Sequence, residues 1–326
     1  MSNLLKVIRK SPTPRDGSII SGRVTGFLKL RLNIVEQTTI HGKLSSIIPS
    51  PSLKKFLNRY SIKRLYKYLR SSGNIRKDWL INLESAFPRH YTLMKRQIRE
   101  YIIIPGSMIK GFSHLRLELM AKPDSKGRVM SCSRLYTWSG REALPSEKGY
   151  VHRQIFTSAK RFRPPCKGPR VCLICDIFGA PGLASRIAFT DLYLIPGNVT
   201  ISEVCNRKCE VALLGTVFER WLIFEYLLPE ELGLILLALG INKLNESKRV
   251  LLGRYRYQCL QTATVSFYVR DLEFIDILSD ENFRDYGLEF VNLSIHRALS
   301  TYANYFDFNI DEVALRAEAI KKLGKL

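Results

Sequence analysis

The chain has 326 residues, of which 46% are hydrophobic, so it is long enough to bury a substantial core in one large domain or two smaller ones. Its 51 lysines and arginines outnumber its 29 aspartates and glutamates and give a formal net charge of +22. Such an excess repels itself unless an anionic partner neutralises it, and nucleic acid is the usual partner. A soluble basic protein or one that meets an anionic membrane surface is the alternative.

The cysteines and the apolar runs indicate in which cellular compartment the protein is expected. The first ten residues, MSNLLKVIRK, are charged too early and have too short an apolar run for a secretory signal. The longest apolar run, Leu232 to Ile241, is about half the length that a membrane span needs. We therefore expect a cytoplasmic protein with no membrane partner, whose seven cysteines stay reduced and more readily bind metal than form disulfides.

The first regular element is predicted at Ser18 to Val35, where basic residues alternate with apolar ones. This alternation indicates a long, half-buried strand or a hairpin. A turn is expected over Thr38 to Gly42. The next segment, Lys43 to Lys77, has no acidic residue, and its basic and apolar residues recur at helical spacing.

That basic helical segment is interpreted as an arm that faces RNA or a neighbouring subunit, because cations of one sign are interleaved with aromatic rings. The alternative is an ordinary solvated helix face. The cations singled out for RNA contact are Lys54, Lys55, Arg59 and Lys63.

A strand-to-helix turn is predicted within YIIIPGSMIKG, residues 101–111. Pro105 stops the strand, Gly106 allows another backbone to approach, and Ser107 is expected to cap the helix. The amides at a helix start attract anions and Lys110 adds a charge, so a phosphate is expected there. The alternative is an ordinary turn, and the spacing is not that of a P-loop.

A polar region, Lys122 to Ser158, is expected to form a protruding hairpin. It leads into a Pro/Gly-rich loop with Cys166, Cys172 and Cys175 in C-x5-C-x2-C spacing, which is suited to one tetrahedral Zn²⁺. His152 is the preferred fourth ligand and Cys132 the alternative. Reduced thiols without metal are the simpler interpretation. A redox C-x-x-C is less favoured, since no helix is expected to start at Cys172.

The remaining elements are predicted from apolar runs and from amphipathic spacing. Strands are expected at Ser185–Ile195, Glu210–Glu225 and Thr262–Val269, and helices at Glu231–Leu239 and Ile310–Leu323.

Three motifs then occur in a recognisable order: IPGSMIKG at residues 104–111, the cysteine loop ending in CDIFG at 175–179, and SRIAFTDLYL at 185–194. In this order they resemble the RAMP superfamily, specifically the backbone subunits of type III CRISPR effector complexes. The resemblance spans residues 18–270.

The resemblance implies a single α+β domain over residues 1–326 with an RRM-like, ferredoxin-like core. Its insertion would be a hairpin with a zinc-binding loop (121–182). The basic helical segment (43–100), which departs from the family pattern, and the C-terminal helix (300–326) are predicted from the sequence itself. The resemblance implies Zn²⁺ bound by His152, Cys166, Cys172 and Cys175. It also implies the IPGS turn against the phosphates of a CRISPR RNA, a target RNA as partner, and other RAMP subunits with the large and small subunits of the complex.

Two departures from the family pattern bear on activity. Members that cut target RNA carry an aspartate between the first strand and the IPGS motif, whereas residues 41–77 contain no acid, and Asp78 is only a weak candidate. A glycine-rich loop of the family is reduced here to Gly253. Arg254 and Arg256 alternate there with tyrosines that suit RNA stacking, and a buried strand is the alternative.

The expected function is therefore that of an RNA-binding backbone subunit that holds guide and target RNA without cutting. The alternatives are a metal-dependent endoribonuclease subunit of the same complex and a stand-alone, zinc-stabilised RNA-binding protein.

Overall fold

The computed structural model describes residues 5–15, 21–39, 102–133, 163–204, 208–253, 256, 264–278 and 282–323. By its contacts the chain divides into two compact units, residues 42–96 and the remainder, and every described residue belongs to the larger unit. The predicted basic segment and most of the predicted hairpin lie outside the described residues. The individual residues Lys54, Lys55, Arg59, Lys63, Asp78, His152 and Arg254 also lie outside them.

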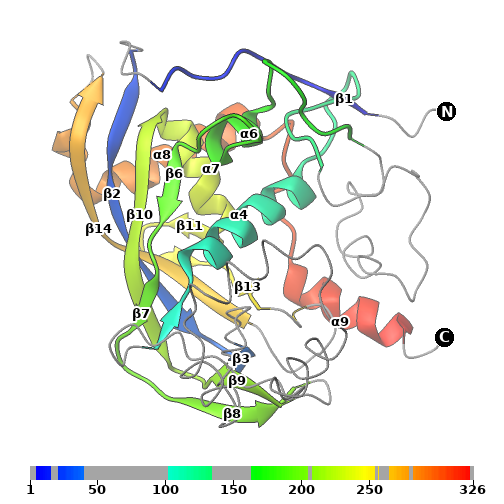
Figure 1. Ribbon diagram of the computed structural model, residues 1–326, viewed down its shortest axis with the longest axis vertical. Helices are drawn as coiled ribbons and strands as arrows, with labels where there is room; N and C mark the ends of the chain where they lie inside the picture. Colours follow the sequence, from blue (N-terminus) through cyan, green and yellow to red (C-terminus); the bar gives the residue numbers. More distant parts are fainter. Residues whose placement is uncertain are drawn as a thin grey trace, which may run out of the picture. The chain divides into compact units, whose positions relative to one another are not determined.

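A seven-stranded antiparallel sheet forms the centre of the fold (Figure 1). Its order is β13-β14-β2-β10-β7-β4, and β6 also pairs with β10. The strands are β2 (Arg23–Ile34), β4 (Ile103–Ile104), β6 (Ile187–Phe189), β7 (Leu192–Leu194), β10 (Val217–Leu227), β13 (Val250–Leu251) and β14 (Thr264–Leu278).

The long elements follow one another as β2, α4 (Gly106–Met120), β6 with β7, β10, α7 (Pro229–Ala238) and β14. This β-α-β-β-α-β succession, with sheet order β14-β2-β10-β7, is a ferredoxin-type arrangement. The fold is therefore α+β, and the predicted ferredoxin-like core is confirmed. Helices α4 and α7 lie on the same side of the sheet (Figure 1).

The central strand β2 forms because its sequence alternates. Leu28, Leu30 and Leu32 are fully buried on the helix side, whereas Lys29 and Arg31 point to the other face. There both cations pair with Glu219 of β10. The strand predicted over residues 18–35 is thus confirmed over 23–34.

Helix α7 is almost entirely buried in the core. Pro229 starts it, and Glu231 accepts a hydrogen bond from the amide of Leu228 at 3.0 Å. Every residue from 231 to 240 is buried. Gly233 lets helix α8 (Phe290–Tyr302) approach, since a Cβ at Gly233 would lie 2.0 Å from the carbonyl oxygen of Ser294. The sequence-based prediction did not include α8.

The smaller elements correct several predicted boundaries. Residues 38–39 form a strand rather than a turn, and the predicted strand 185–195 is interrupted between β6 and β7. The predicted strand 210–225 is divided by a turn at Gly215. These elements are β1 (Lys6–Val7), β3 (Thr38–Thr39), β5 (Arg128–Val129), β8 (Val199–Glu203), β9 (Lys208–Ala212), β11 (Ile241–Lys243), β12 (Glu246–Ser247), α6 (Leu173–Phe178), η2 (Phe283–Glu289) and α9 (Glu312–Leu323). Across the described ranges, no helix has the length and apolarity that a membrane span requires.

Candidate functional site

The cysteine loop contains a short helix that the sequence did not predict. Cys172 is the N-cap of α6, and its sulfur accepts a hydrogen bond from the amide of Cys175. The expectation that no helix starts at Cys172 is therefore wrong. A six-residue helix gives too little hydrophobic periodicity to be recognised from sequence, and its N-cap is a cysteine rather than the usual serine, threonine or aspartate.

Four thiols converge at this loop. The sulfurs of Cys132, Cys166, Cys172 and Cys175 all lie within 4.8 Å of one another, so the cluster is able to hold a metal ion. Cys132 lies between β5 and the part of the chain outside the described residues. The alternative fourth ligand named from the sequence is thus at the site. The preferred one, His152, stays untested.

The donor set fits a tetrahedral soft-metal site. Zinc binds thiolates at about 2.3 Å, which places tetrahedral sulfurs about 3.8 Å apart. The Cys132 and Cys175 sulfurs are 3.5 Å apart, far beyond the roughly 2.05 Å of a disulfide bond. None of these four cysteines forms a disulfide bond.

Backbone amides also point at these sulfurs. Cys172 accepts from the amide of Cys132 at 3.4 Å and from that of Cys175 at 3.5 Å. Cys166 accepts from the amide of Cys172 at 3.2 Å. Such N–H···S bonds fix the orientation of a thiolate and stabilise its charge.

The thiols do not titrate alike. Hydrogen bonds from Cys132 and the other thiols lower the pKa of Cys166, the least buried of the four. Hydrogen bonding to its neighbours, followed by burial, raises the pKa of Cys172. A bound metal cation would require the thiolate form of each ligand and would displace the protons that the thiols carry.

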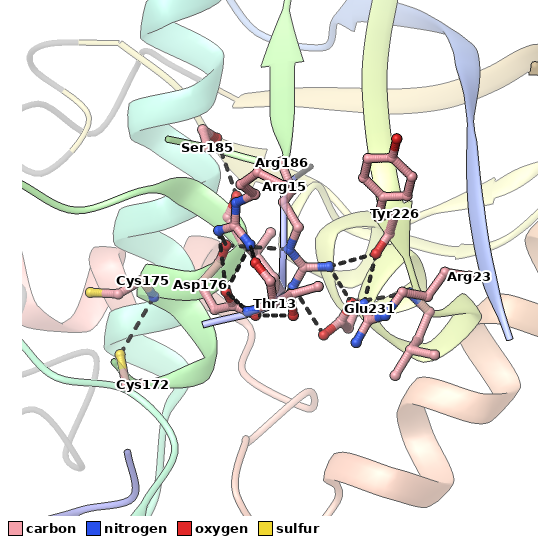
Figure 2. A network of polar contacts seen from close by, with 12 residues as sticks. Thr13, Arg15, Arg23, Cys172, Cys175, Asp176, Ser185, Arg186, Tyr226 and Glu231 are labelled. Atoms are coloured by element: carbon pink, nitrogen blue, oxygen red, sulfur yellow. Dashed lines mark hydrogen bonds and ion pairs between the residues drawn. The ribbon is translucent and has the colours of Figure 1, made fainter. Parts of the chain in front are cut away.

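Next to the thiols lies a buried network of charges that sequence reasoning missed. Arg186 is fully buried and reaches Asp176 on one side at 2.8 Å and Glu231 on the other at 2.7 Å. Arg23 also pairs with Glu231, at 3.0 Å. Figure 2 shows Arg186 between the two carboxylates. Asp176 and Arg186 stood within the CDIFG and SRIAFTD motifs, and no other feature of the sequence pointed to them.

Burial alone raises the pKa of Asp176 and of Glu231, but the facing arginines reverse that effect. The net result is a pKa below the ordinary value for both carboxyls. The network also holds Tyr226 in a left-handed conformation, with φ of 51°. Its carbonyl accepts from Arg23 at 2.7 Å and from Arg186 at 2.8 Å. The network therefore joins the cysteine loop to β2, β10 and α7.

The IPGS turn packs against the break between β6 and β7. Helix α4 begins at Gly106, whose amide donates to the Asp191 carboxylate at 3.0 Å. A Cβ at Gly106 would lie 1.9 Å from the carbonyl oxygen of Phe189, so the predicted close backbone approach is confirmed. The predicted cap is wrong: Pro105 is the N-cap without a side-chain hydrogen bond, and Ser107 is exposed inside the first turn.

Two further residues predicted to contact RNA, Lys110 and Arg256, already contact other parts of the protein. Lys110 is half-buried, its ammonium donates to the carbonyl of Ile187 at 3.1 Å, and burial lowers its pKa. The guanidinium of Arg256 lies 5.7 Å from the ring centre of Phe112. Either residue would therefore meet RNA from a position already set by protein contacts.

No family model and no curated protein sequence matches the chain. Among solved structures, the crystal structure of Csc2 from Thermofilum pendens matches with a TM-score of 0.35 and 13% sequence identity. That match covers 92% of this chain and 84% of the other.

Proposed function

We propose that this protein is an RNA-binding backbone subunit of a type III CRISPR ribonucleoprotein. It would hold the CRISPR RNA and its target RNA in antiviral defence, beside other RAMP subunits and the large and small subunits, without cutting the target. It would carry one structural Zn²⁺.

One observation carries this proposal: the three motifs that resemble the family meet in space. Gly106 of IPGSMIKG bonds to Asp191, 85 positions away, and Lys110 bonds to Ile187, 77 positions away. Ser185, the first residue of SRIAFTD, donates to the carbonyl of Ile177 in CDIFG at 3.1 Å. Motifs that matched by chance would have no reason to form one contiguous unit on a ferredoxin-type core.

The zinc assignment rests on the donor set. Four thiols within 4.8 Å match a closed, all-sulfur structural site, since catalytic zinc sites usually keep one position for water. Soft thiolate ligands select zinc over the hard cations calcium and magnesium. The zinc would therefore stabilise the fold and leave the chemistry of RNA to other groups.

The RNA assignment rests on charge. A net charge of +22 supplies the electrostatic attraction that phosphate binding needs, and it favours affinity over sequence preference. The absence of acidic residues from 43–77 favours a subunit that binds RNA and does not cut it.

Purification from the native host followed by sequencing of bound RNA tests this proposal. We expect short RNAs with a common repeat-derived 5′ tag, together with other RAMP subunits. Heterogeneous RNA, or a protein that elutes alone, would instead support a stand-alone zinc-stabilised RNA-binding protein. Asp78, Glu84 and Glu100 are the only acidic residues between His41 and Pro105. In the assembled complex, replacing any one of them by alanine should leave cleavage of target RNA unchanged; loss of cleavage would support the nuclease alternative.

A further inference from the structure

The segment of residues 5–15 runs along the cysteine loop and contacts each piece of chain that carries a thiol. At its start, β1 pairs in parallel with β5, and the amide of Ile8 donates to the carbonyl of Val129 at 2.8 Å. β5 leads directly to Cys132. The first thiol is thus positioned by a strand whose partner is this segment.

The middle of the segment holds the next two thiols. The Arg9 guanidinium donates to the carbonyl of Pro164 at 2.8 Å and to that of Pro165 at 3.3 Å, immediately before Cys166. Lys10 and Val171 exchange both backbone hydrogen bonds at 2.9 Å, immediately before Cys172.

The end of the segment holds α6. Asp176 follows Cys175 and accepts from the Thr13 amide at 2.9 Å and from the Thr13 hydroxyl at 2.7 Å. Arg15 donates to the carbonyl of Asp176 at 2.7 Å and pairs with its carboxylate at 3.2 Å. Figure 2 shows Thr13 and Arg15 beside Asp176, with Cys172 and Cys175 on the same short helix.

We propose that residues 5–15, with Arg9 and Thr13 as the main contacts, are positioning residues of the metal centre whose docking is coupled to metal binding. The inference rests on the proposed Zn²⁺ and extends it, because none of these residues has a ligand atom in the thiol cluster.

The physical reason lies in the ligand arrangement. The four thiols come from three separate stretches of chain, around residues 132, 166 and 172–175, and thiolates repel one another without a cation. The amides of Cys132 and Cys172 link neighbouring stretches in pairs, and residues 5–15 add contacts to all three. Whatever favours the docked segment then favours metal binding, and metal binding favours docking to the same extent.

The test compares Arg9→Met and Thr13→Val with Thr216→Val in the full-length protein. Each substitution keeps the size of the side chain and removes its polar donor. Thr216 is a matched control because it is buried and donates to the carbonyl of Asn198 at 3.0 Å, in the turn before β10. The Zn²⁺ affinity of each folded variant is measured by competition with a chromophoric chelator, and its thermal stability is recorded in parallel.

We expect Arg9→Met and Thr13→Val each to weaken Zn²⁺ binding by about tenfold, the effect typical of residues that orient ligands. Thr216→Val should lower thermal stability while its Zn²⁺ affinity stays that of the unaltered protein. Removal of Zn²⁺ should also speed amide hydrogen exchange in residues 5–15 while α7 stays protected.

Unchanged Zn²⁺ affinity in both variants would overturn the inference and leave the metal site itself intact. An equal loss of affinity in Thr216→Val would overturn it too, since the effect would then be general destabilisation. If the unaltered protein takes up no Zn²⁺, it is the proposed metal that fails.

Discussion

The amide of Gly106 donates to the carboxylate of Asp191 at 3.0 Å, so the first turn of α4 is fixed to the break between β6 and β7. An anion at a helix start interacts favourably with its amides and dipole, and here the protein supplies one of its own. A phosphate at this turn would have to share the helix start with Asp191. The turn therefore serves mainly to pack α4 against β6 and β7, and an RNA contact there would be additional to this role.

Gly106→Ala should prevent the core from packing. Its Cβ would lie 1.9 Å from the carbonyl oxygen of Phe189, a contact that backbone cannot relieve without moving β6 away from α4. Gly111→Ala on the same helix is the matched control, because no described atom lies within 4 Å of a Cβ there. That control should gain about 0.5–1 kcal/mol from helix propensity. Chemical unfolding measures the free energy of unfolding of both variants. Equal stability of the two would contradict the close packing of Gly106 against β6.

Cys132→Ser and His152→Ala distinguish the two candidates for the fourth ligand. The Cys132 sulfur lies among the other three, so we expect Cys132→Ser to lower bound zinc strongly, as Cys172→Ser should. His152→Ala should keep the full zinc content. Elemental analysis after dialysis gives the answer, and zinc lost from His152→Ala but kept in Cys132→Ser would reverse the assignment.

The buried charge network predicts a loss of stability in acid. The pKa values of Asp176 and Glu231 are below ordinary, so their ion pairs contribute full stability above the carboxyl values of the unfolded chain, about 3.9 and 4.3. That contribution is lost as the pH falls below about 4, through the lower folded pKa values. Urea unfolding measured at pH values above and below 4, with a chelator present to remove the effect of metal, should show this loss of stability.

Arg186→Met tests the same ion pairs by removing the cation that lies between Asp176 and Glu231. At neutral pH it leaves the carboxylates of Asp176 and Glu231 buried with fewer cationic partners, and breaking a buried pair in this way costs about 3–5 kcal/mol. The penalty should shrink in acid, where the carboxyls take up protons. Glu246→Gln, in an exposed pair with Lys243, serves as the control and should show little effect at any pH. A penalty for Arg186→Met that does not vary with pH would argue against charge as its cause.

RNA affinity should fall steeply as the salt concentration rises. The slope of the logarithm of the binding constant against the logarithm of the salt concentration reports the number of phosphates that the protein neutralises. Replacement of Lys54, Lys55, Arg59 and Lys63 by glutamine should reduce the slope by about 0.7 for each phosphate that the variant no longer neutralises. A control variant removes the same charge at four exposed positions elsewhere, Lys126, Lys243, Arg270 and Arg284. Equal slopes for the two variants would show that the basic segment acts only through net charge.

Lys110→Ala should lower the same slope slightly and also destabilise the fold, because its ammonium donates to the carbonyl of Ile187. Lys110→Arg should restore the charge and part of the hydrogen bond. A slope unchanged in Lys110→Ala would remove its phosphate role and leave the structural one.

The sequence by itself determined the elements that carry strong local patterns. The alternation of Leu28, Leu30 and Leu32 with charged residues identified β2, and the apolar run behind Pro229 identified α7. The Pro-Gly pair at 105–106 located the strand-to-helix turn. In these segments the spacing of neighbouring apolar residues predicts which face is buried, so no information from distant parts of the chain is needed.

Tertiary structure alone decided which distant groups meet. Cys132 joined the other thiols, Arg186 lay between Asp176 and Glu231, and residues 5–15 lay along the cysteine loop. Each of these contacts joins residues brought together by folding of the whole core, and the energy that selects them comes from desolvation and charge pairing at that place. A linear spacing rule does not contain those terms, and for this reason Ser107 was expected as a cap while Asp191, 85 positions from Gly106, took the amide of the helix start.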